Sequence, residues 1–362
     1  MKTTHLMLMA AVAIGASSLT GCSDKTYEPD DSTLDAGNAI RFAVNTELTR
    51  AGDITTNNLS SFYVYAFTDV QDTPSLFMDN VEVTKNSTNV WTYSPVEYWP
   101  AGKTVDFYAY APAGWVGLGA MNGPVAYESY PGTQDIIYAV CADMKGNTGM
   151  ANAQVLLNFR HALSKVTLKL SSTNSDLQVK VSNVALSHIR SKGNFYFPTV
   201  TTSPDSGDGV GHWEDQNTPV PYLFHMSQAA DDVITLTSTP SDMSNSSMGL
   251  GGSKYLVPQP LPWTSDGGET DAYITVMCSI YDSHTGAKLW PNANTPEDNI
   301  VEGSTFGDGL LKFPLATSSF TSWKPGYHYI YNLVINSNDE MGAIEFGTPT
   351  VDSYVDVSTI YE

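Results

Sequence analysis

Positive charge and cysteine are both scarce in this sequence. Lysine and arginine number 17 against 38 aspartates and glutamates, which gives a formal net charge of −21 at pH 7. Such a chain repels phosphate backbones and anionic headgroups, so we expect no nucleic acid among its partners. The three cysteines have no CxxC spacing, which argues against a cysteine-based zinc site.

Two of the cysteines, Cys141 and Cys278, lie far apart in the sequence. An exported protein could join them in a disulfide. We instead expect two separate buried thiols, because the adjacent Val140 and Met277 are typical of core strands.

Long helical patterns are missing as well. Short runs rich in Val, Ile, Tyr and Phe alternate with clusters of Gly, Pro, Asn and Asp, which predicts an all-β protein built from β-sandwiches. The predicted strands cover 39–44, 61–67, 75–83, 90–93, 104–110, 135–140, 162–170, 177–186, 194–197, 233–238, 254–257, 272–280, 327–335 and 343–361. The longest predicted loops are 201–216, 239–252 and 292–309.

Motifs of catalysis are also missing. The seven histidines form no HExxH spacing, and neither a GxSxG elbow nor a phosphate-binding loop is present. His161 and His328 are expected to be strand residues with satisfied hydrogen bonds rather than metal ligands. We therefore expect no catalytic residues, no metal and no cofactor, and we do not interpret the chain as an enzyme.

The N-terminus has the layout of an export signal. Residues 1–21 have a lysine at position 2, continue as an apolar run too short to span a bilayer, and end on small residues. The sequence LTGC that ends at Cys22 resembles a bacterial lipobox, which predicts cleavage before Cys22 and lipidation of its thiol. The lipid would anchor the globular part to a membrane. The alternative is an ordinary secretion signal with an incidental cysteine.

Two short segments resemble each other and favour two related domains. Each has a tryptophan, then a turn with proline and glycine, then an aromatic-rich strand, at 98–110 and at 322–333. In both segments the tryptophan is expected to cover one end of a sandwich. We expect an N-terminal domain over 51–158 and a C-terminal domain over 159–362, with the boundary near Asn158.

Several short pieces follow one another along the chain. They are the lipobox at Cys22, IRF at 40–42 with TRA at 49–51, SFYVYAF at 61–67, EYWP at 97–100 with FYAYAP at 107–112, FRHALSKV at 159–166, KYLVPQ at 254–259 and WKPGYHY at 323–329. Taken in this order, the pieces resemble the fimbrillins, the Mfa-like and FimA-like pilus subunits of anaerobic gut and oral bacteria. The resemblance covers nearly the whole chain. It implies two transthyretin-like β-sandwich domains in tandem, export as an outer-membrane lipoprotein precursor, and polymerisation into a surface fibre that serves adhesion.

The resemblance also implies a maturation step. In the family, an arginine-specific protease cuts after an arginine and releases a strand near the N-terminus, and the C-terminal strand of a neighbouring subunit fills the groove. Arg50 fits that pattern, with Ala51 as the new N-terminus and residues 22–50 as a tether and removable propeptide that contains the first strand. The alternative is that Arg50 is an ordinary loop cation.

Residues 343–361 form the candidate donor strand at the C-terminus. Val351, Val355 and Val357 are the expected anchors on one face, and Ile344 and Phe346 form a first, separate segment. The alternative is that this stretch is the last strand of its own sandwich.

Together these features predict a structural subunit of a cell-surface fimbria (pilus). Its expected partners are copies of itself or other fimbrial subunits, the arginine-specific protease, the membrane through its lipid, and a host or bacterial surface ligand. One alternative is an anchor or tip accessory subunit. Another is a surface glycan-binding lipoprotein, in which exposed tryptophans stack on sugars, and the candidates are Trp115, Trp213, Trp263 and Trp290.

Overall fold

The chain is all-β, as the sequence predicted. Its regular structure in the described residues consists of twenty strands and two short 3₁₀ turns, η2 (Ala230–Asp232) and η4 (Glu297–Asn299), with no α-helix. None of the described segments is a helix that is long and apolar enough to cross a membrane. All of them belong to one compact unit, residues 36–362. The computed structural model describes residues 39–44, 54, 58–68, 74–117, 123–146, 154–203, 209–243, 252–264, 267–318, 320–336 and the backbone of 350–353.

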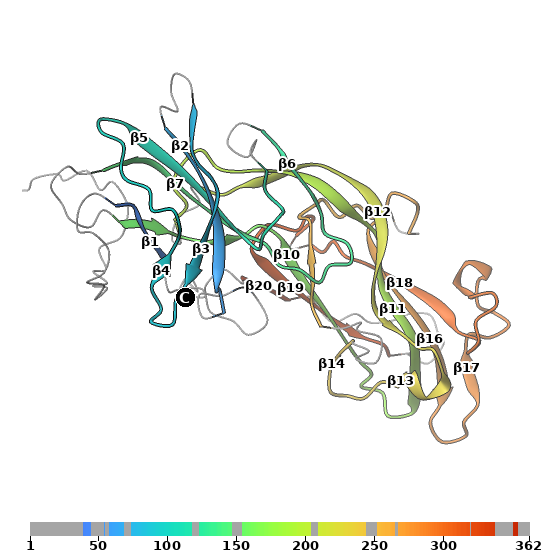
Figure 1. The fold of residues 1–362 in the computed structure, drawn as a ribbon. Coiled ribbons are helices and arrows are strands. Elements are labelled where there is room, and N and C mark those ends of the chain that lie inside the picture. The colour runs from blue at the N-terminus through green and yellow to red at the C-terminus, as the bar shows by residue number, and fades with distance from the viewer. Residues whose placement is uncertain are drawn as a thin grey trace, which may run out of the picture. The chain divides into compact units, whose positions relative to one another are not determined.

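A six-stranded antiparallel sheet forms the centre of the N-terminal half (Figure 1). Apolar clusters pack on both of its faces, which explains why its inner strands are apolar almost without interruption rather than alternating. Its strands, in order across the sheet, are β4 (Trp91–Thr92), β3 (Ser75–Lys85), β2 (Ser61–Thr68), β5 (Thr104–Ala111), β7 (Ile137–Lys145) and β9 (Arg160–His161).

Among the described residues, the second layer of this sandwich is a sheet of two strands. It consists of β1 (Arg41–Val44) and β8 (Gln154–Leu157), which pair in parallel. Residues of both strands share one hydrophobic cluster with β2, β5 and β7. This sandwich therefore depends on a strand from the beginning of the chain.

The C-terminal half is a sandwich of two larger sheets that enclose a second cluster. One sheet contains β14 (Ser241–Asp242), β10 (Ser164–Ser171), β19 (Tyr327–Val334) and β20 (Thr350–Ser353), with β15 (Lys254–Leu256) also on β10. The other contains β12 (His212–Met226), β11 (Leu177–Tyr196), β16 (Tyr273–Asp282) and β17 (Lys288–Trp290), with β6 (Val125–Glu128) and β13 (Ile234–Thr235) on β11 and β18 (Gly309–Pro314) on β16.

A third, aromatic cluster contains residues from both halves of the chain. Tyr110 and Tyr138 come from the six-stranded sheet, whereas Phe195 and Trp213 come from β11 and β12. The ring centroids of Tyr138 and Phe195 are 4.8 Å apart. In addition, β6 precedes residue 158 in the sequence yet pairs with β11. The two halves thus share a ladder and a core.

The two tryptophan segments adopt the same local arrangement. Trp99 and Trp323 are both buried, each in the core of its own sandwich. Gly102 and Gly326 have φ of +74° and +76°, a left-handed conformation that glycine adopts without strain, and the strands β5 and β19 begin shortly after them. Each tryptophan therefore packs into a core shortly before a strand begins.

Cys141 and Cys278 are buried separately, as expected. Cys141 lies in the cluster between β1 and the six-stranded sheet, and Cys278 lies in the C-terminal sandwich. No disulfide links the two. Burial raises the pKa of the Cys278 thiol far above its usual range, so this thiol is unreactive.

Several predicted boundaries in the C-terminal half are wrong. The predicted strands 177–186 and 194–197 are one strand, β11, and residues 212–216 of the predicted loop 201–216 belong to β12. Only Ile234–Thr235 of the predicted strand 233–238 is extended in a ladder. The β12 segment contains Pro219 and Pro221, which suggest a loop in the sequence but are tolerated because β12 is an edge strand of its sheet.

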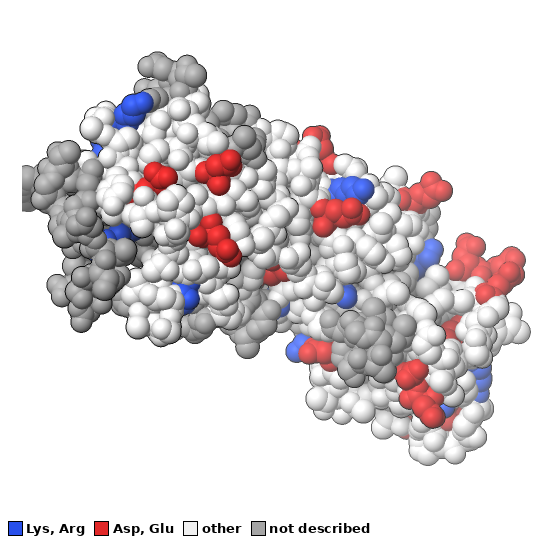
Figure 2. All heavy atoms as spheres, in the orientation of Figure 1, with Lys and Arg blue, Asp and Glu red and all other residues white. Residues whose placement is uncertain are grey.

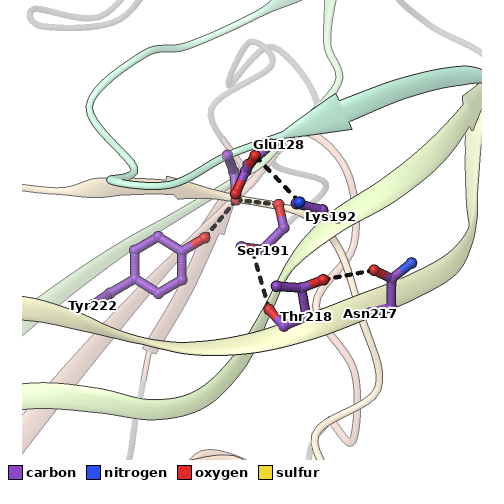
Figure 3. A network of polar contacts seen from close by, with 7 residues as sticks. Glu128, Ser191, Lys192, Asn217, Thr218 and Tyr222 are labelled. Carbon is purple, nitrogen blue, oxygen red and sulfur yellow. Dashed lines mark hydrogen bonds and ion pairs between the residues drawn. The ribbon is translucent and has the colours of Figure 1, made fainter.

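A polar network fastens β6 to β11 and β12 (Figure 3). The hydroxyls of Tyr222 and Ser129 are 2.7 Å apart, and Ser129 Oγ also donates to the carbonyl of Ser191 at 3.2 Å. Beside them Lys192 Nζ lies 3.6 Å from Glu128 Oε2. Burial raises the pKa of Tyr222, so its hydroxyl stays protonated and available as a donor.

We expect Tyr222→Phe to lower the free energy of unfolding by about 1 kcal/mol, the usual net value of one buried hydrogen bond. The ring remains in place, so only the contact with Ser129 is lost. Chemical denaturation measures the change. Tyr130→Phe is the matched control, because Tyr130 is 53% exposed, and it should change stability by less than about 0.5 kcal/mol.

Candidate functional site: the first strand and its seat

The first strand, β1, is short but deeply buried on one face. Ile40, just before the strand, is 1% exposed, Phe42 is 4% exposed and Val44 is 9% exposed, whereas Arg41 and Ala43 on the other face are half-buried. This alternation is the period of a strand with one face in a core. We call the side chains that receive this face the β1 seat, namely Phe62, Tyr93, Phe107, Val155 and Leu157.

Backbone pairing holds β1 mainly on one side. In the parallel ladder with β8, Phe42 lies opposite Val155 and Val44 lies opposite Leu157. Within the described part of the chain, β8 has no other ladder partner. Loss of β1 would therefore leave both the ladder groups of β8 and the apolar seat without a partner.

Phe42 is the central anchor of β1. Its ring makes edge-to-face contacts with three aromatic rings, at centroid distances of 5.4 Å to Tyr93, 5.7 Å to Phe107 and 6.0 Å to Phe62. Such pairs add about 0.5–1.5 kcal/mol each beyond the burial of their area. The middle of the seat is consequently shaped for an aromatic side chain.

Hydrogen bonds to the backbone of Ile40 fix the chain just before β1. Its N–H donates to the carbonyl of Glu97 at 2.9 Å, and its carbonyl accepts from the Tyr93 hydroxyl at 2.9 Å. Burial raises the pKa of Tyr93 to about 12, so the hydroxyl remains a donor at neutral pH. Ala39 forms an isolated antiparallel bridge with Tyr98.

The chain is fastened again shortly after β1. The N–H of Ile54 donates to Asp135 Oδ2 at 3.1 Å, and the same oxygen lies 2.8 Å from Nδ1 of His161. Both side chains of this pair are almost fully buried, and Ile54 itself packs against the cluster that holds β1. Arg50 therefore lies in the sequence between two fixed points, Val44 and Ile54.

Most of the site residues predicted from the sequence lie outside the described residues. These are Cys22, Arg50, Ala51, Ile344, Phe346, Val355 and Val357. Val351 lies in β20, where its backbone is opposite Tyr329 in an antiparallel ladder of four residue pairs. The predicted strand residues His161 and His328 do have hydrogen-bonding partners, Asp135 and Thr167 respectively.

The tryptophans considered for sugar stacking are mainly parts of the core. Trp115 and Trp213 are 8% and 9% exposed, and their indole N–H groups donate to the carbonyls of Ala111 and Ala162. Trp263 is half-buried against Tyr273. The half-buried ring of Trp290 lies so close to Gly309 that no side chain would fit there. The four tryptophans therefore expose little ring surface on which a sugar could stack.

Three residues of the site were not predicted from the sequence. Tyr93 and Asp135 bind backbone groups of distant segments, and Val155 belongs to a strand that was not expected at all. The only available signal was that the sequence contains both a carboxylate, Asp135, and the expected strand histidine, His161, which contact each other in the structure. Because the two residues are far apart in the sequence, this contact could not be recognised there.

Electrostatics does not single out the β1 seat, whose five members are uncharged. On the face drawn in Figure 2, acidic side chains are spread over the described residues with basic ones scattered between them. With a net charge of −21, two copies of the chain repel each other at long range. Any self-association must then depend on apolar and backbone contacts.

These observations define the class of structure. It is an incomplete sandwich that is closed by a short strand from the beginning of the chain. A sequence model described as fimbrillin-like matches residues 49–353. The chain belongs to the fimbrillin-like family.

Several solved structures are similar to the chain. A fimbrial protein from Bacteroides vulgatus aligns with 87% of this chain and 99% of its own, at 17% identity and a TM-score of 0.57, which supports a shared fold. Candidate cell adhesion proteins from Bacteroides uniformis and Bacteroides eggerthii align over 90% and 89% of this chain, and over 100% and 98% of their own, at 14% and 13% identity and TM-scores of 0.47 and 0.48. No curated protein sequence matches the chain.

Proposed function

We propose that this protein is a polymerising subunit of a cell-surface fimbria that serves adhesion. It is exported as a lipoprotein anchored to the outer membrane through Cys22 and cut after Arg50 by an arginine-specific protease. The cut frees β1, and the C-terminal strand of a neighbouring subunit takes its place. Each of these steps was expected from the sequence, and the contacts around β1 support the exchange of that strand.

The observation that carries the proposal is the burial of β1 against the β1 seat. Cleavage of one peptide bond, the bond after Arg50, would remove the covalent link between β1 and this seat. Each of its three inward side chains contributes roughly 1.5–3 kcal/mol by leaving water. The total is comparable with the whole stability of a typical domain, about 5–15 kcal/mol. A subunit that has lost β1 is consequently driven to bind a replacement strand.

The position of Arg50 suits this role. A cut there separates β1 from the remainder of the chain, while the downstream chain stays attached through the hydrogen bond from Ile54 to Asp135. Before the cut, the covalent link gives β1 a high effective concentration at its seat, in the millimolar range for short flexible links, so it excludes the strand of another subunit. Cleavage removes that advantage.

The expected assembly is an open filament. The donor is a C-terminal segment and the acceptor is the β1 seat, so the two surfaces differ and the contact is head-to-tail. Addition of a strand to unpaired ladder groups supplies hydrogen bonds along β8 and side-chain contacts in the seat. Because this chain has both Arg50 and a long C-terminal tail, it suits a stalk subunit better than an anchor that keeps its first strand.

The test is digestion of the lipid-free precursor, beginning at Ser23, with an arginine-specific protease. We expect a new N-terminus at Ala51 by mass spectrometry and a ladder of multimers by sizing. Arg50→Lys should stay uncut at this position and monomeric. Arg41→Lys is the matched control and should behave as the unmodified chain, since Arg41 lies inside β1.

The proposal has a clear negative result. A chain that starts at Ala51, has lost the β1 fragment and still remains strictly monomeric at high concentration would contradict strand exchange. Lipidation is tested separately by labelling cells with a fatty acid, which should mark the unmodified precursor and leave Cys22→Ser unlabelled.

A further inference from the structure

The sequence of β1 recurs near the other end of the chain. Residues 39–44 read AIRFAV, and residues 343–348 read AIEFGT. Ala, Ile and Phe are identical in the two segments, and the final Val and Thr are both β-branched and similar in volume. The second segment follows β19 and immediately precedes Pro349.

Two of the three identical residues, Ile and Phe, stand at positions that are buried in β1, and the third, Ala39, is half-buried. Ile40, Phe42 and Val44 point inward, and their counterparts are Ile344, Phe346 and Thr348. The two positions where the chemistry changes most, Arg against Glu and Ala against Gly, correspond to the half-buried outer face of β1. A shared requirement for one groove explains this division.

Residues 351–357 of the C-terminal tail lack this pattern. In 351–357 (VDSYVDV), Tyr354 is the only aromatic residue, and it is flanked at the two positions on its own face by Asp352 and Asp356. The valines of the opposite face carry no aromatic between them. The middle of the seat, where three aromatic rings surround Phe42, would therefore be left unfilled by 351–357.

We propose that residues 343–348 of a second copy of this chain occupy the β1 seat in the register of β1, parallel to β8. Phe346 then lies opposite Val155 and contacts the same three rings as Phe42, with Ile344 and Thr348 in the places of Ile40 and Val44. This inference rests on the strand exchange proposed above and names its donor segment and register. The Thr348 hydroxyl is tolerated because the place of Val44 is at the rim of the seat, 9% exposed.

The proposed donor segment is covalently joined to β20, so its transfer to another copy affects that strand. Only Pro349 separates the proposed donor segment from β20, so the start of β20 moves with the segment when another copy takes it up. The ladder of four residue pairs between β20 and β19 is then given up in the donor. Upstream, residues 337–342 span up to about 20 Å when extended, which is the reach available between Asn336 and the donor segment.

The experiment compares two variants of the full chain after cleavage, Phe346→Ala and Val355→Ala. For Phe346→Ala we expect the protein concentration needed for polymers to rise about a hundredfold or more, since a large aromatic anchor is lost. Val355→Ala changes an expected anchor of the competing segment 351–357 and should raise that concentration far less than Phe346→Ala does. Thermal unfolding of each uncleaved precursor shows whether the variant is folded before the assay.

The register is tested by cross-linking in mixtures of two variants. Arg41 pairs with Gln154 in β1, so Glu345 of the donor should lie opposite Gln154 of the acceptor. Cα atoms of neighbouring strands are about 5 Å apart, within reach of a disulfide. Gln154→Cys mixed with Glu345→Cys should give an intermolecular disulfide after cleavage, and Gln154→Cys mixed with Asp352→Cys should not.

The outcomes separate the two proposals. Polymers that tolerate Phe346→Ala but are lost with Val355→Ala, or a disulfide to position 352, would overturn the donor assignment and leave strand exchange standing. If the cleaved unmodified chain forms no polymer at all, the proposed function fails, and the donor assignment fails with it.

Discussion

Phe42→Ala is expected to lower the free energy of unfolding of the uncleaved precursor by about 3–5 kcal/mol. The substitution empties the middle of the β1 seat and removes three edge-to-face ring contacts. β8 loses its ladder partner whenever the weakened strand detaches. Urea denaturation followed by tryptophan fluorescence measures the change, because Trp91 and Trp99 belong to or pack against the same cluster.

Phe306→Ala is the control for this prediction. Phe306 is half-buried and lies outside the three hydrophobic clusters, so its truncation should cost much less. The same pair of variants tests the function. After cleavage, Phe42→Ala should release the β1 fragment sooner and form multimers faster than the unmodified chain. An unchanged unfolding midpoint for Phe42→Ala would mean that β1 is not part of the folded core.

The strand β1 could be predicted from local sequence, but its partner could not. Alternation of Ile40, Phe42 and Val44 with less apolar residues indicates a strand with one buried face, and the structure confirms it. The parallel pairing with β8 depends on a strand of four residues that follows a glycine-containing stretch, and so short a run carries no usable period. Local patterns identify strands, whereas long-range pairing is decided by packing.

The errors in the C-terminal half have a related cause. Pro219 and Pro221 interrupt the apolar period of β12, but an edge strand has an unpaired side on which a proline costs no ladder hydrogen bond. Positive φ at His188 in β11 and Asp215 in β12 coincides with shifts in the register between the two strands, which further disturb the alternation. Edge position is a property of the whole sheet and cannot be recognised in one segment.

The candidate site was predictable only in part for the same reason. The cut position and the donor segment were expected from the resemblance to the fimbrillins, whereas the seat itself is assembled from side chains on β2, β5, β8 and the loop after β4. The repeat of AIRFAV as AIEFGT is visible in the sequence. It acquires meaning only when the burial of β1 shows which of its positions enter a core.

Asp135→Ala is the second substitution for which we expect a large effect, a loss of about 2–5 kcal/mol in the free energy of unfolding. The change removes the buried acceptor of the Ile54 N–H and takes the carboxylate away from Nδ1 of His161. Each buried group that loses such a partner costs about 1–3 kcal/mol. Thermal and urea denaturation of the precursor measure the loss.

Asp135→Asn separates hydrogen bonding from charge in this prediction. The amide keeps one oxygen acceptor at nearly the same place, so it should retain more of the stability than alanine does. A functional readout follows from the position of Ile54, the first described residue after Arg50. If the bond to Asp135 holds the chain after β1 has left, the cleaved Asp135→Ala subunit should be degraded further from its new N-terminus, while the cleaved Asp135→Asn subunit resists. Equal resistance in all three chains would show that Ile54 is held by its apolar packing alone.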